Sequence, residues 1–600
     1  MSHIVPYWRR YGWLIAVALS FIFLESIGDL LQPMIVSRII DQGVMEGSLS
    51  VVLRLGGLML LVTLFGAGCA VTRCIISSRV SQQFGADLRL DLFTQINRFS
   101  FAALGKRETA SLITRMTNDT SQLVSFTHAM MRVFVRSPML LFGAITMTFL
   151  LNPRLAMILL VVVPLIALLM YISMKVGFPL FSRMQEALDR NNAVLREYLS
   201  GVRVVKAYNT FDQEVARFDV SNTDLANASI KAARVIGVFF PIISFAANMA
   251  LVATLWLARG WIANQQMYVG QVVAFLNYMM QITMSLRMTF NVYQMFIRAR
   301  ASAQRVGDVL AGDEEDKTVG LCPGRQGEQD AKRPTSPTPR KLLEKLDQNC
   351  IKTAPCAVLG IEFSHVTFAY PGGGNEPVLR DVSFVLPPGE ALGIIGPTGA
   401  GKTSLVQLIP AFYLPQAGEV KVGGVATHEV DVDELRGAIA YVSQQNTLFY
   451  GTIADNIRMG KADAAMEEIE AAARAAAAHD FIAAFPEGYE TIVSQKGVNL
   501  SGGQKQRLGI ARALVRGAQI LILDDCVSAV DVETEAAIMR AVSGLDPAPT
   551  IVMITQRISS VMNLRHILVM DAGGAAGYGD HAYLMENCSV YKEIYHSQLI

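Results

Sequence analysis

The sequence predicts an all-α membrane domain with six transmembrane helices and long cytoplasmic extensions, followed by an α/β domain with a helical subdomain. Of the 600 residues, 52% are hydrophobic and only 17% are charged, and the mean hydropathy is +0.35. Soluble chains carry about 25% charged residues, so much of this chain is expected to contact lipid. In the second half, an apolar strand pattern leads through a glycine-rich loop into a helix.

Charge and cysteine content exclude other classes of protein. The 52 basic and 51 acidic residues balance, so the chain lacks the basic footprint of a nucleic-acid partner. Seven scattered cysteines show neither a disulfide framework nor the spacing of a zinc site.

Six apolar runs within residues 1–310 each approach the ~20 residues that cross a bilayer. They cover residues 12–34, 55–76, 133–152, 154–174, 236–258 and 269–296. The first run is longer than the apolar core of a signal peptide and lacks a convincing cleavage site. It is therefore expected to stay as the first transmembrane helix.

The distribution of Lys and Arg predicts the orientation. Residues 73–132 hold eight and residues 175–235 hold nine, whereas the other three connections hold about four between them. Because positive charge collects inside, both long connections, the N-terminus and everything after residue 300 are expected on the cytoplasmic side of the cell membrane.

Both long connections have apolar residues at helical spacing, in Ser81–Phe99 and Met184–Tyr208. Some 20 extra residues at 1.5 Å each extend a membrane helix ~30 Å into the cytoplasm. Turns able to contact a cytoplasmic partner are expected at Thr109–Asp119 and Asn209–Phe218.

Two carboxylates interrupt the first apolar run. Glu25 and Asp29 are four residues apart and therefore share one helix face. Carboxylates are costly in a membrane and face a polar cavity or a partner. One interpretation is contact with a cationic substrate, and the other is hydrogen bonding between helices.

Residues 311–358 change character. Acidic residues are followed by Lys, Arg, Pro, Gly and Gln without periodicity, which predicts a linker that is partly disordered. The linker separates the membrane domain from residues 359–600.

Within residues 359–600, the strand Ala391–Ile395 leads into a phosphate-loop pattern that opens a helix. Glycines let backbone N–H groups close around an anion, and the helix N-terminus favours its negative charge. Lys402 is expected to reach the β- and γ-phosphates of a nucleotide, and Thr403 to hold Mg²⁺. The predicted loop consists of Gly396, Pro397, Thr398, Gly399, Ala400, Gly401, Lys402, Thr403 and Ser404.

Two further patterns complete a nucleotide domain. The strand Ile520–Leu523 ends at Asp524, which suits a magnesium-holding carboxylate at the C-terminal edge of a sheet. A second anion site is predicted where a helix begins near Lys505, and it is expected to serve a nucleotide held by another copy of the domain. Its residues are Ser501, Gly502, Gly503 and Gln504.

With these motifs the chain resembles an ATP-binding cassette (ABC) exporter of the half-transporter type, and Leu500–Gln504 matches the signature motif of that family. The resemblance implies ATP with Mg²⁺ as cofactors and a second half-transporter chain as partner. It implies that Tyr370 stacks on adenine, with core packing as the alternative. It also implies that Gln444 senses the γ-phosphate and the magnesium ion, and that Asp531 communicates across the dimer.

Two residues depart from the family pattern. Asp525 stands where hydrolytic sites usually carry Glu, and Gln556 stands where a His normally contacts the γ-phosphate. Asp is shorter by one methylene, about 1.5 Å, and a misplacement on the scale of 1 Å can cost ~10²-fold in rate. Gln556 can donate a hydrogen bond but cannot exchange a proton.

The predicted function is therefore one half of a heterodimeric, multidrug-type exporter of hydrophobic or amphipathic small molecules. Its own ATP site would be impaired in hydrolysis, and its signature motif would complete the partner's site. The alternatives are a homodimeric exporter with slow ATPase activity, an ATP-sensing regulatory or gating subunit, and a lipid or peptide as substrate.

Overall fold

The computed structural model describes residues 4–264, 266–312, 358–371, 376–526 and 530–598. The chain divides into two compact units. The first contains Met1–Ile96 and Ala110–Ala311, and the second contains Asn97–Thr109 and Gly312–Ile600. Most of the predicted linker at 311–358 lies outside the described residues.

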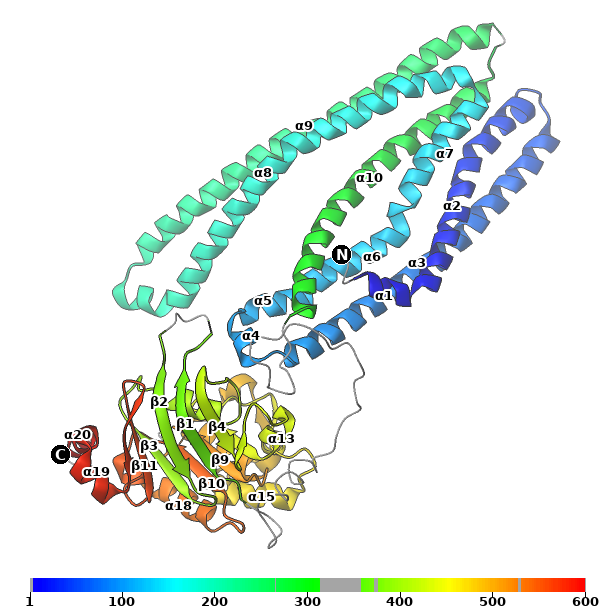
Figure 1. The fold of residues 1–600 in the computed structure, drawn as a ribbon. Helices are drawn as coiled ribbons and strands as arrows, with labels where there is room; N and C mark the ends of the chain where they lie inside the picture. The colour runs from blue at the N-terminus through cyan, green and yellow to red at the C-terminus, as the bar shows by residue number, and fades with distance from the viewer. Residues whose placement is uncertain (1–3, 265, 313–357, 372–375, 527–529, 599–600) are drawn as a thin grey trace. The chain divides into compact units, whose positions relative to one another are not determined.

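The first unit is helical, and its long helices extend far beyond the thickness of a bilayer (Figure 1). With 49 and 56 residues, α3 and α8 are about 74 and 84 Å long. Both helices therefore continue beyond the ~30 Å of a bilayer core, as predicted, and the cytoplasmic location of the extensions stays a prediction. The helices are α1 (Val5–Arg10), α2 (Gly12–Arg38), α3 (Leu49–Asn97), α5 (Thr109–Thr114), α6 (Thr120–Ala129), α7 (Arg136–Leu151), α8 (Pro153–Tyr208), α9 (Phe211–Ala263) and α10 (Val269–Leu310).

Each of the six predicted apolar runs falls in a long helical segment of its own, except that the third run ends one residue beyond its segment, at Asn152. Among the described residues, five such segments are long and apolar enough to cross a membrane: Gly12–Val44, Leu49–Asn97, Thr109–Leu151, Pro153–Tyr208 and Phe211–Ala263. The sixth run lies in α10, which is 42 residues long but is not among these five. The number of six transmembrane helices thus stays a prediction.

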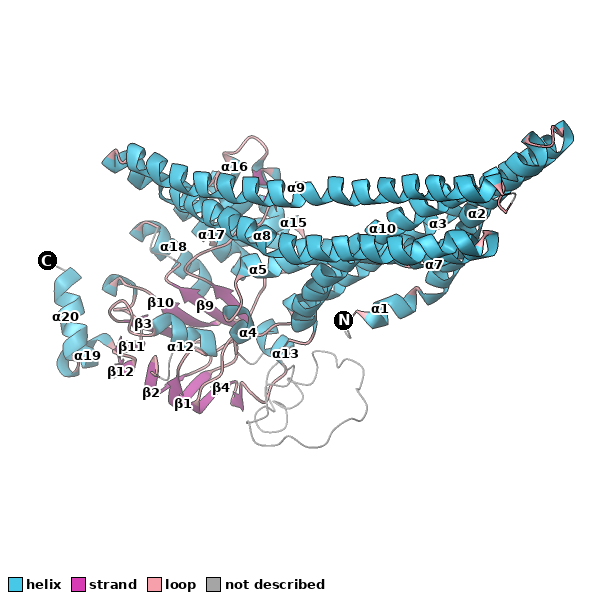
Figure 2. Cartoon of the chain, turned by 90° about the horizontal axis from the view of Figure 1, so that it is seen from above, coloured by secondary structure: helices cyan, strands magenta, loops and turns pink. Residues whose placement is uncertain are grey.

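The helices of this unit pack in two groups. Figures 1 and 2 show α8 and α9 side by side along their length, while α10 packs against α2 and α7. Local sequence sets the ends of α8: the Asn152 side chain accepts from Arg154 N–H at 3.0 Å, Pro153 occupies the first turn, and Asn209 ends the helix in a left-handed conformation. Large apolar side chains such as Leu160 and Trp256 are exposed, as expected of a lipid-facing surface.

One predicted turn is misplaced. Thr109–Asp119 is helical and leads on towards α6, whereas the chain reverses earlier, around the short helix α4 (Phe101–Gly105). Ser100 begins α4 because its hydroxyl accepts from Ala103 N–H at 3.2 Å. The other predicted turn, Asn209–Phe218, contains a much shorter one, since α9 already begins at Phe211.

The second unit is built around two sheets. Within the described residues, a six-stranded sheet has the order β12-β11-β3-β10-β9-β6, with antiparallel pairing only at β11–β12, and a four-stranded antiparallel sheet has the order β2-β1-β4-β5. The strands are β1 (Ile361–Phe368), β2 (Leu379–Leu386), β3 (Ala391–Ile395), β4 (Ala417–Val422), β5 (Val425–Ala426), β6 (Ile439–Val442), β7 (Gly451–Thr452), β8 (Ile492–Val493), β9 (Ile520–Asp524), β10 (Thr550–Ile554), β11 (His566–Asp571) and β12 (Gly574–Gly579).

Helices cover both faces of the parallel sheet, so its central strands are continuous apolar runs. Along β9, Ile520 and Ile522 face the core shared with β1, β2 and α12, whereas Leu521 and Leu523 face the core shared with the helical segment 453–514. The helices are α12 (Lys402–Leu408), α13 (Val432–Gly437), α14 (Ile453–Arg458), α15 (Met466–Ala475), α16 (His479–Ala483), α17 (Gly502–Leu514), α18 (Val532–Ser543), α19 (His581–Asn587) and α20 (Ser589–Gln598).

Candidate functional site

The phosphate loop lies between β3 and α12, as the sequence predicts. Gly396, Gly399 and Gly401 have φ values of +155°, +86° and +91°, a region that side chains rarely adopt. At Gly396 a Cβ would lie 2.1 Å from the carbonyl oxygen of Met570, so only glycine fits there. The loop therefore holds its backbone close to the N-terminus of α12.

A cavity of about 340 Å³ opens at this loop. Lys402 lines it and donates from Nζ to the carbonyl oxygens of Gly396 and Pro397, both at 2.8 Å. Burial lowers the pKa of Lys402, and the nearby Asp525 and Asp524 oppose that shift. The lining consists of Val378, Thr398, Gly399, Gly401, Lys402, Thr403, Ser404, Gln444, Asp525, Ile554 and Gln556.

Asp524 ends β9 and is 1% exposed. Its Oδ1 accepts from the Thr403 hydroxyl at 3.0 Å, and its Oδ2 accepts from the Tyr441 hydroxyl at 2.8 Å. Burial raises the pKa of Asp524, while the hydrogen bonds from Tyr441 and Thr403 oppose the shift.

The pair of Thr403 and Asp524 fits Mg²⁺. A hydroxyl beside a carboxylate supplies hard oxygen ligands, and Mg²⁺ typically takes one or two protein ligands together with phosphates and water. No cluster of three or more His, Cys, Asp or Glu residues able to hold a metal occurs in the part of the chain that the structure describes. A bound nucleotide would therefore share the ion with Thr403 and Asp524.

Asp525 follows directly and lies in a left-handed conformation with φ +47°, 6% exposed. Its backbone N–H donates to Ile554 O at 3.1 Å, which fixes it beside β10. Its Oδ2 accepts from Nε2 of Gln444 at 3.2 Å and from Nε2 of Gln556 at 2.9 Å. Three residues that the sequence singled out thus meet at one oxygen atom.

The second predicted anion site lies elsewhere in this unit. Ser501 begins α17: its hydroxyl accepts from Gln504 N–H at 3.3 Å, and its own N–H donates to Gln504 Oε1 at 2.9 Å. Ser501 and Gly502 are exposed, and a Cβ on Gly502 would meet no atom within 4 Å. None of Ser501–Gln504 lines the cavity at the phosphate loop.

Comparisons with known proteins agree with this architecture. The family model of the ABC transporter transmembrane region matches residues 15–286, and the ABC transporter model matches residues 379–528. The uncharacterized ABC transporter ATP-binding protein YfiB of Bacillus subtilis (strain 168) is 34% identical over 598 residues, which cover 100% of this chain and 98% of that protein. The chain belongs to the ABC transporter family.

Two further comparisons concern a named transporter and a solved structure. The fatty acid ABC transporter ATP-binding/permease protein of Mycobacterium bovis (strain ATCC BAA-935 / AF2122/97) is 34% identical over 507 residues, covering 84% of this chain and 75% of that protein. A bacterial Atm1-family ABC exporter solved with ATP bound matches with a TM-score of 0.78 and 24% identity, over 98% of this chain and 99% of that chain. The chain therefore has the fold of an ABC exporter, a family that couples ATP hydrolysis to transport.

In this transporter, Tyr370 lies outside the lining of the cavity. Its hydroxyl is 2.9 Å from Ser404 Oγ and donates to Gln407 Oε1 at 3.1 Å, and its ring meets those of Phe368 and Tyr413 edge to face. These contacts agree with the alternative in which Tyr370 packs in the core of the domain. Stacking of Tyr370 on adenine stays a proposal.

Asp531 begins α18, where its side chain accepts from Thr534 N–H at 2.9 Å. It is exposed and lies outside the lining of the cavity. At this position Asp531 is accessible to another chain. Its predicted role in communication across a dimer stays a proposal.

The two carboxylates of the first membrane helix are paired within the chain. Glu25 is 5% exposed; its Oε2 accepts from Arg73 Nε at 2.8 Å, and its Oε1 lies 3.0 Å from Arg136 Nη1. Asp29 Oδ2 accepts from Arg136 Nη2 at 2.7 Å. These bonds join α2, α3 and α7, so the geometry favours interhelical pairing over contact with a cationic substrate.

Sequence reasoning missed two residues near the site. The hydroxyl of Tyr441 on β6 donates a hydrogen bond to Asp524. The sequence feature that could have pointed to it is a hydroxyl-bearing residue in an apolar strand, three residues before Gln444. Gln598 on α20 donates to the carbonyl oxygen of Gln556 at 2.6 Å, and no sequence pattern pointed to it.

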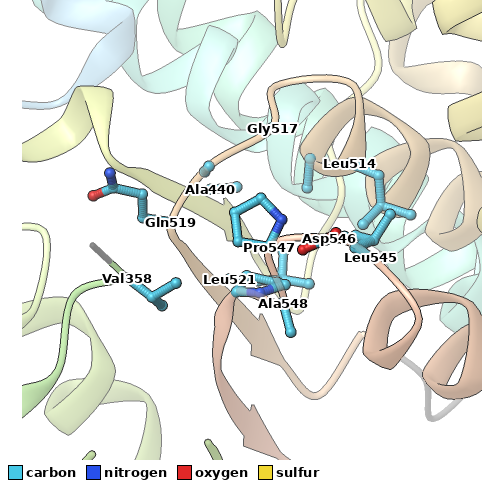
Figure 3. Close-up of a pocket in the computed structure, with 13 residues that line it drawn as sticks. Val358, Ala440, Leu514, Gly517, Gln519, Leu521, Leu545, Asp546, Pro547 and Ala548 are labelled. Atoms are coloured by element: carbon cyan, nitrogen blue, oxygen red, sulfur yellow. The ribbon is translucent and has the colours of Figure 1, made fainter. Parts of the chain in front are cut away.

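A second cavity of about 330 Å³ lies near the N-terminal end of β9 (Figure 3). Its lining is mainly apolar and includes Ala440, Leu521 and the segment Leu545–Pro549. None of the predicted site residues lines it. The nucleotide chemistry is therefore assigned to the cavity at the phosphate loop.

Proposed function

We propose that this ABC exporter is one half of a heterodimer in the cell membrane, and that its own site binds Mg²⁺–ATP but hydrolyses it slowly. The observation that carries the proposal is the environment of Asp525, whose Oδ2 accepts side-chain amide hydrogen bonds from both Gln444 and Gln556. One of the two oxygens with which Asp525 could accept a proton from water is thus already engaged by two amide donors.

The length and chemistry of these side chains support the same proposal. A general base must first reach the attacking water, and Asp reaches about 1.5 Å less far than Glu. The amide of Gln556 cannot take up or release a proton as a histidine does. Binding depends on other groups, the phosphate loop with Lys402 and the pair of Thr403 and Asp524, which are all in place.

The mechanism follows from where the two anion sites lie. Each ATP would lie between the phosphate loop of one chain and the exposed N-terminus of α17 in the other, because α17 does not reach the cavity of its own chain. Mg²⁺, held through Thr403 and Asp524, would neutralise developing charge on the phosphates. Hydrolysis would occur in the partner's site, which this chain completes with Ser501–Gln504.

The proposed membrane arrangement has six transmembrane helices, with the N-terminus and the nucleotide domain in the cytoplasm. The excess of Lys and Arg in residues 73–132 and 175–235 supports this orientation. The exposed apolar surfaces of α3, α8 and α9 support contact with lipid. The proposed substrate is a hydrophobic or amphipathic small molecule, of the multidrug type, and the name of the mycobacterial fatty acid transporter supports the amphipathic class.

The test compares the purified full chain with the complex that copurifies through a tag on it. The chain alone is expected to bind a fluorescent ATP analogue and to hydrolyse ATP slowly, while the complex hydrolyses it with stimulation by substrate. The double substitution Asp525→Glu and Gln556→His should raise turnover in this chain's site by at least about tenfold. Rapid hydrolysis by the isolated chain that is lost in Asp525→Asn would overturn the proposal.

A further inference from the structure

A row of aromatic rings connects α4 with Asp524. The ring of Phe101 lies 4.5 Å from that of Phe412, measured between centroids. Phe412 meets Tyr441 edge to face at 5.5 Å and an interplanar angle of 73°. The Tyr441 hydroxyl then donates to Asp524 Oδ2 at 2.8 Å. Two ring contacts and one hydrogen bond thus cover the path from a short connecting helix to the end of β9.

The ends of this row are positioned by the fold. Tyr441 lies on β6, whose parallel pairing with β9 sets it opposite Ile522, two residues before Asp524. Arg436 stacks over Phe412 at 5.2 Å and donates to the carbonyl oxygens of Pro410 and Ala411, both at 3.1 Å. The backbone next to Phe412 is therefore tied to the end of α13, the helix that precedes β6.

The two oxygens of Asp524 have different partners. Oδ1 faces Thr403, the residue that would share a magnesium ion with it, and Oδ2 faces Tyr441. A hydrogen bond to each oxygen fixes the plane of the carboxylate. Burial, followed by the charge of Asp524, raises the pKa of Tyr441 well above its usual value, so at neutral pH the phenol stays protonated and donates.

We propose that Tyr441 is a positioning residue for the magnesium-binding carboxylate, and that Phe412 transmits the position of α4 to it. A shift of Phe101 would repack Phe412 against the Tyr441 ring and alter the hydrogen bond that orients Asp524. The proposal rests on the assignment of Asp524 to Mg²⁺ made above. It gives the chain a route to metal binding from α4, which the sequence joins to the long helix α3 and to the short helix α5.

The experiment measures binding of TNP-ATP to the full chain in detergent, first in EDTA and then at increasing Mg²⁺. Tyr441→Phe keeps the ring and removes only the hydroxyl. It is expected to raise the Mg²⁺ concentration for half-maximal effect by about tenfold, the effect of losing one hydrogen bond to a charged group. Binding in EDTA should stay unchanged, because the phosphate loop is untouched.

Tyr413→Phe is the matched control. Tyr413 belongs to the same aromatic cluster, but among the described residues its hydroxyl forms no hydrogen bond to Asp524. The Mg²⁺ dependence of TNP-ATP binding in Tyr413→Phe should therefore equal that of the unmodified chain. Equal Mg²⁺ dependence of Tyr441→Phe and Tyr413→Phe would overturn the inference. Failure of the unmodified chain to bind TNP-ATP would instead count against the proposed function.

A double-mutant cycle tests the transmission through the rings. Phe101→Ala is expected to shift the Mg²⁺ dependence in the same direction as Tyr441→Phe, and by less. In the double variant the shift should equal that of Tyr441→Phe alone, because α4 would act through the phenol. If the two shifts multiply, α4 acts independently of Tyr441 and the relay is wrong.

Discussion

Gln598 and Gln556 are 42 residues apart, yet Gln598 Nε2 lies 2.6 Å from the carbonyl oxygen of Gln556. The Oε1 of the same side chain accepts from Ile558 N–H at 2.8 Å. One amide of α20 therefore holds the backbone on both sides of Arg557. Arg557 in turn donates to the buried Glu535 at 3.0 Å, so the segment that presents Gln556 to Asp525 is fixed from two directions.

Gln598→Leu is expected to loosen this segment. Two hydrogen bonds of about 1 kcal/mol each are lost, so a fluorescent ATP analogue should dissociate about tenfold faster in stopped-flow measurements. Ser597→Ala is the control on the same helix, because the Ser597 hydroxyl bonds only to Ile594 O of its own helix among the described residues. An unchanged dissociation rate in Gln598→Leu would show that α20 does not hold the site.

Gly502→Asp should fold and bind ATP normally. Nothing lies within 4 Å of a Cβ at Gly502, and an acidic residue in the first turn suits the dipole of α17. The added charge would instead repel the phosphates of a nucleotide held by the partner, so ATPase activity of the copurified complex should fall by at least about tenfold. Normal activity of that complex would contradict the assignment of α17 to the partner's site.

Glu25→Gln is expected to destabilise the membrane domain. It leaves Arg73 and part of Arg136 without their anion, and breaking a buried ion pair costs about 3–5 kcal/mol. Thermal unfolding of the full chain should show the loss, and Asp29→Asn, at a carboxylate that is 30% exposed, should show less.

The combined variant Glu25→Met, Arg73→Met separates pairing from substrate contact. An apolar pair of similar volume should restore most of the unfolding temperature. Transport of a cationic substrate by this variant would exclude a direct role for the carboxylate, whereas a stable variant that no longer transports cations would support that role.

Asp524→Asn should raise the unfolding temperature in EDTA by about 2–4 °C, the shift that about 1 kcal/mol gives a unit of this size. The reason is that a buried charge, held there for the metal, is removed. Stabilisation by Mg²⁺ with ATP should be lost at the same time. Asp531→Asn is the control, since Asn is an equally good helix cap. A lower unfolding temperature for Asp524→Asn would contradict the cost of this charge.

The sequence predicted features that depend on short stretches of chain. The phosphate loop follows from a strand, glycines and a helix within residues 391–408, and the long helices α3 and α8 follow from unbroken helical spacing. The meeting of Gln444, Asp525 and Gln556 depends on the strand order β10-β9-β6, which brings the ends of three strands side by side. The family resemblance named these residues, but the sequence did not predict that they share one oxygen atom.

Features that depend on distant partners were not predictable. Arg73 lies 48 residues from Glu25, and periodicity says nothing about which helix faces which. The turn was placed at Thr109–Asp119 because helical spacing continues past the real one, where Ser100 starts α4. Tyr441 and Gln598 act through hydrogen bonds whose partners come from other elements.

In the proposed heterodimer, the exposed start of α17, which does not line the cavity of its own chain, has a consequence for genetics. A substitution in Ser501–Gln504 would stop hydrolysis in the partner chain's site while leaving nucleotide bound in the site of this chain. A substitution of Lys402 would instead remove nucleotide from the site of this chain and leave it bound in the partner chain's site. Alleles that alter Ser501–Gln504 and alleles that alter Lys402 should therefore differ in which chain of the heterodimer retains trapped nucleotide. Co-expressing the two alleles cannot rescue export, because each heterodimer contains only one copy of this chain.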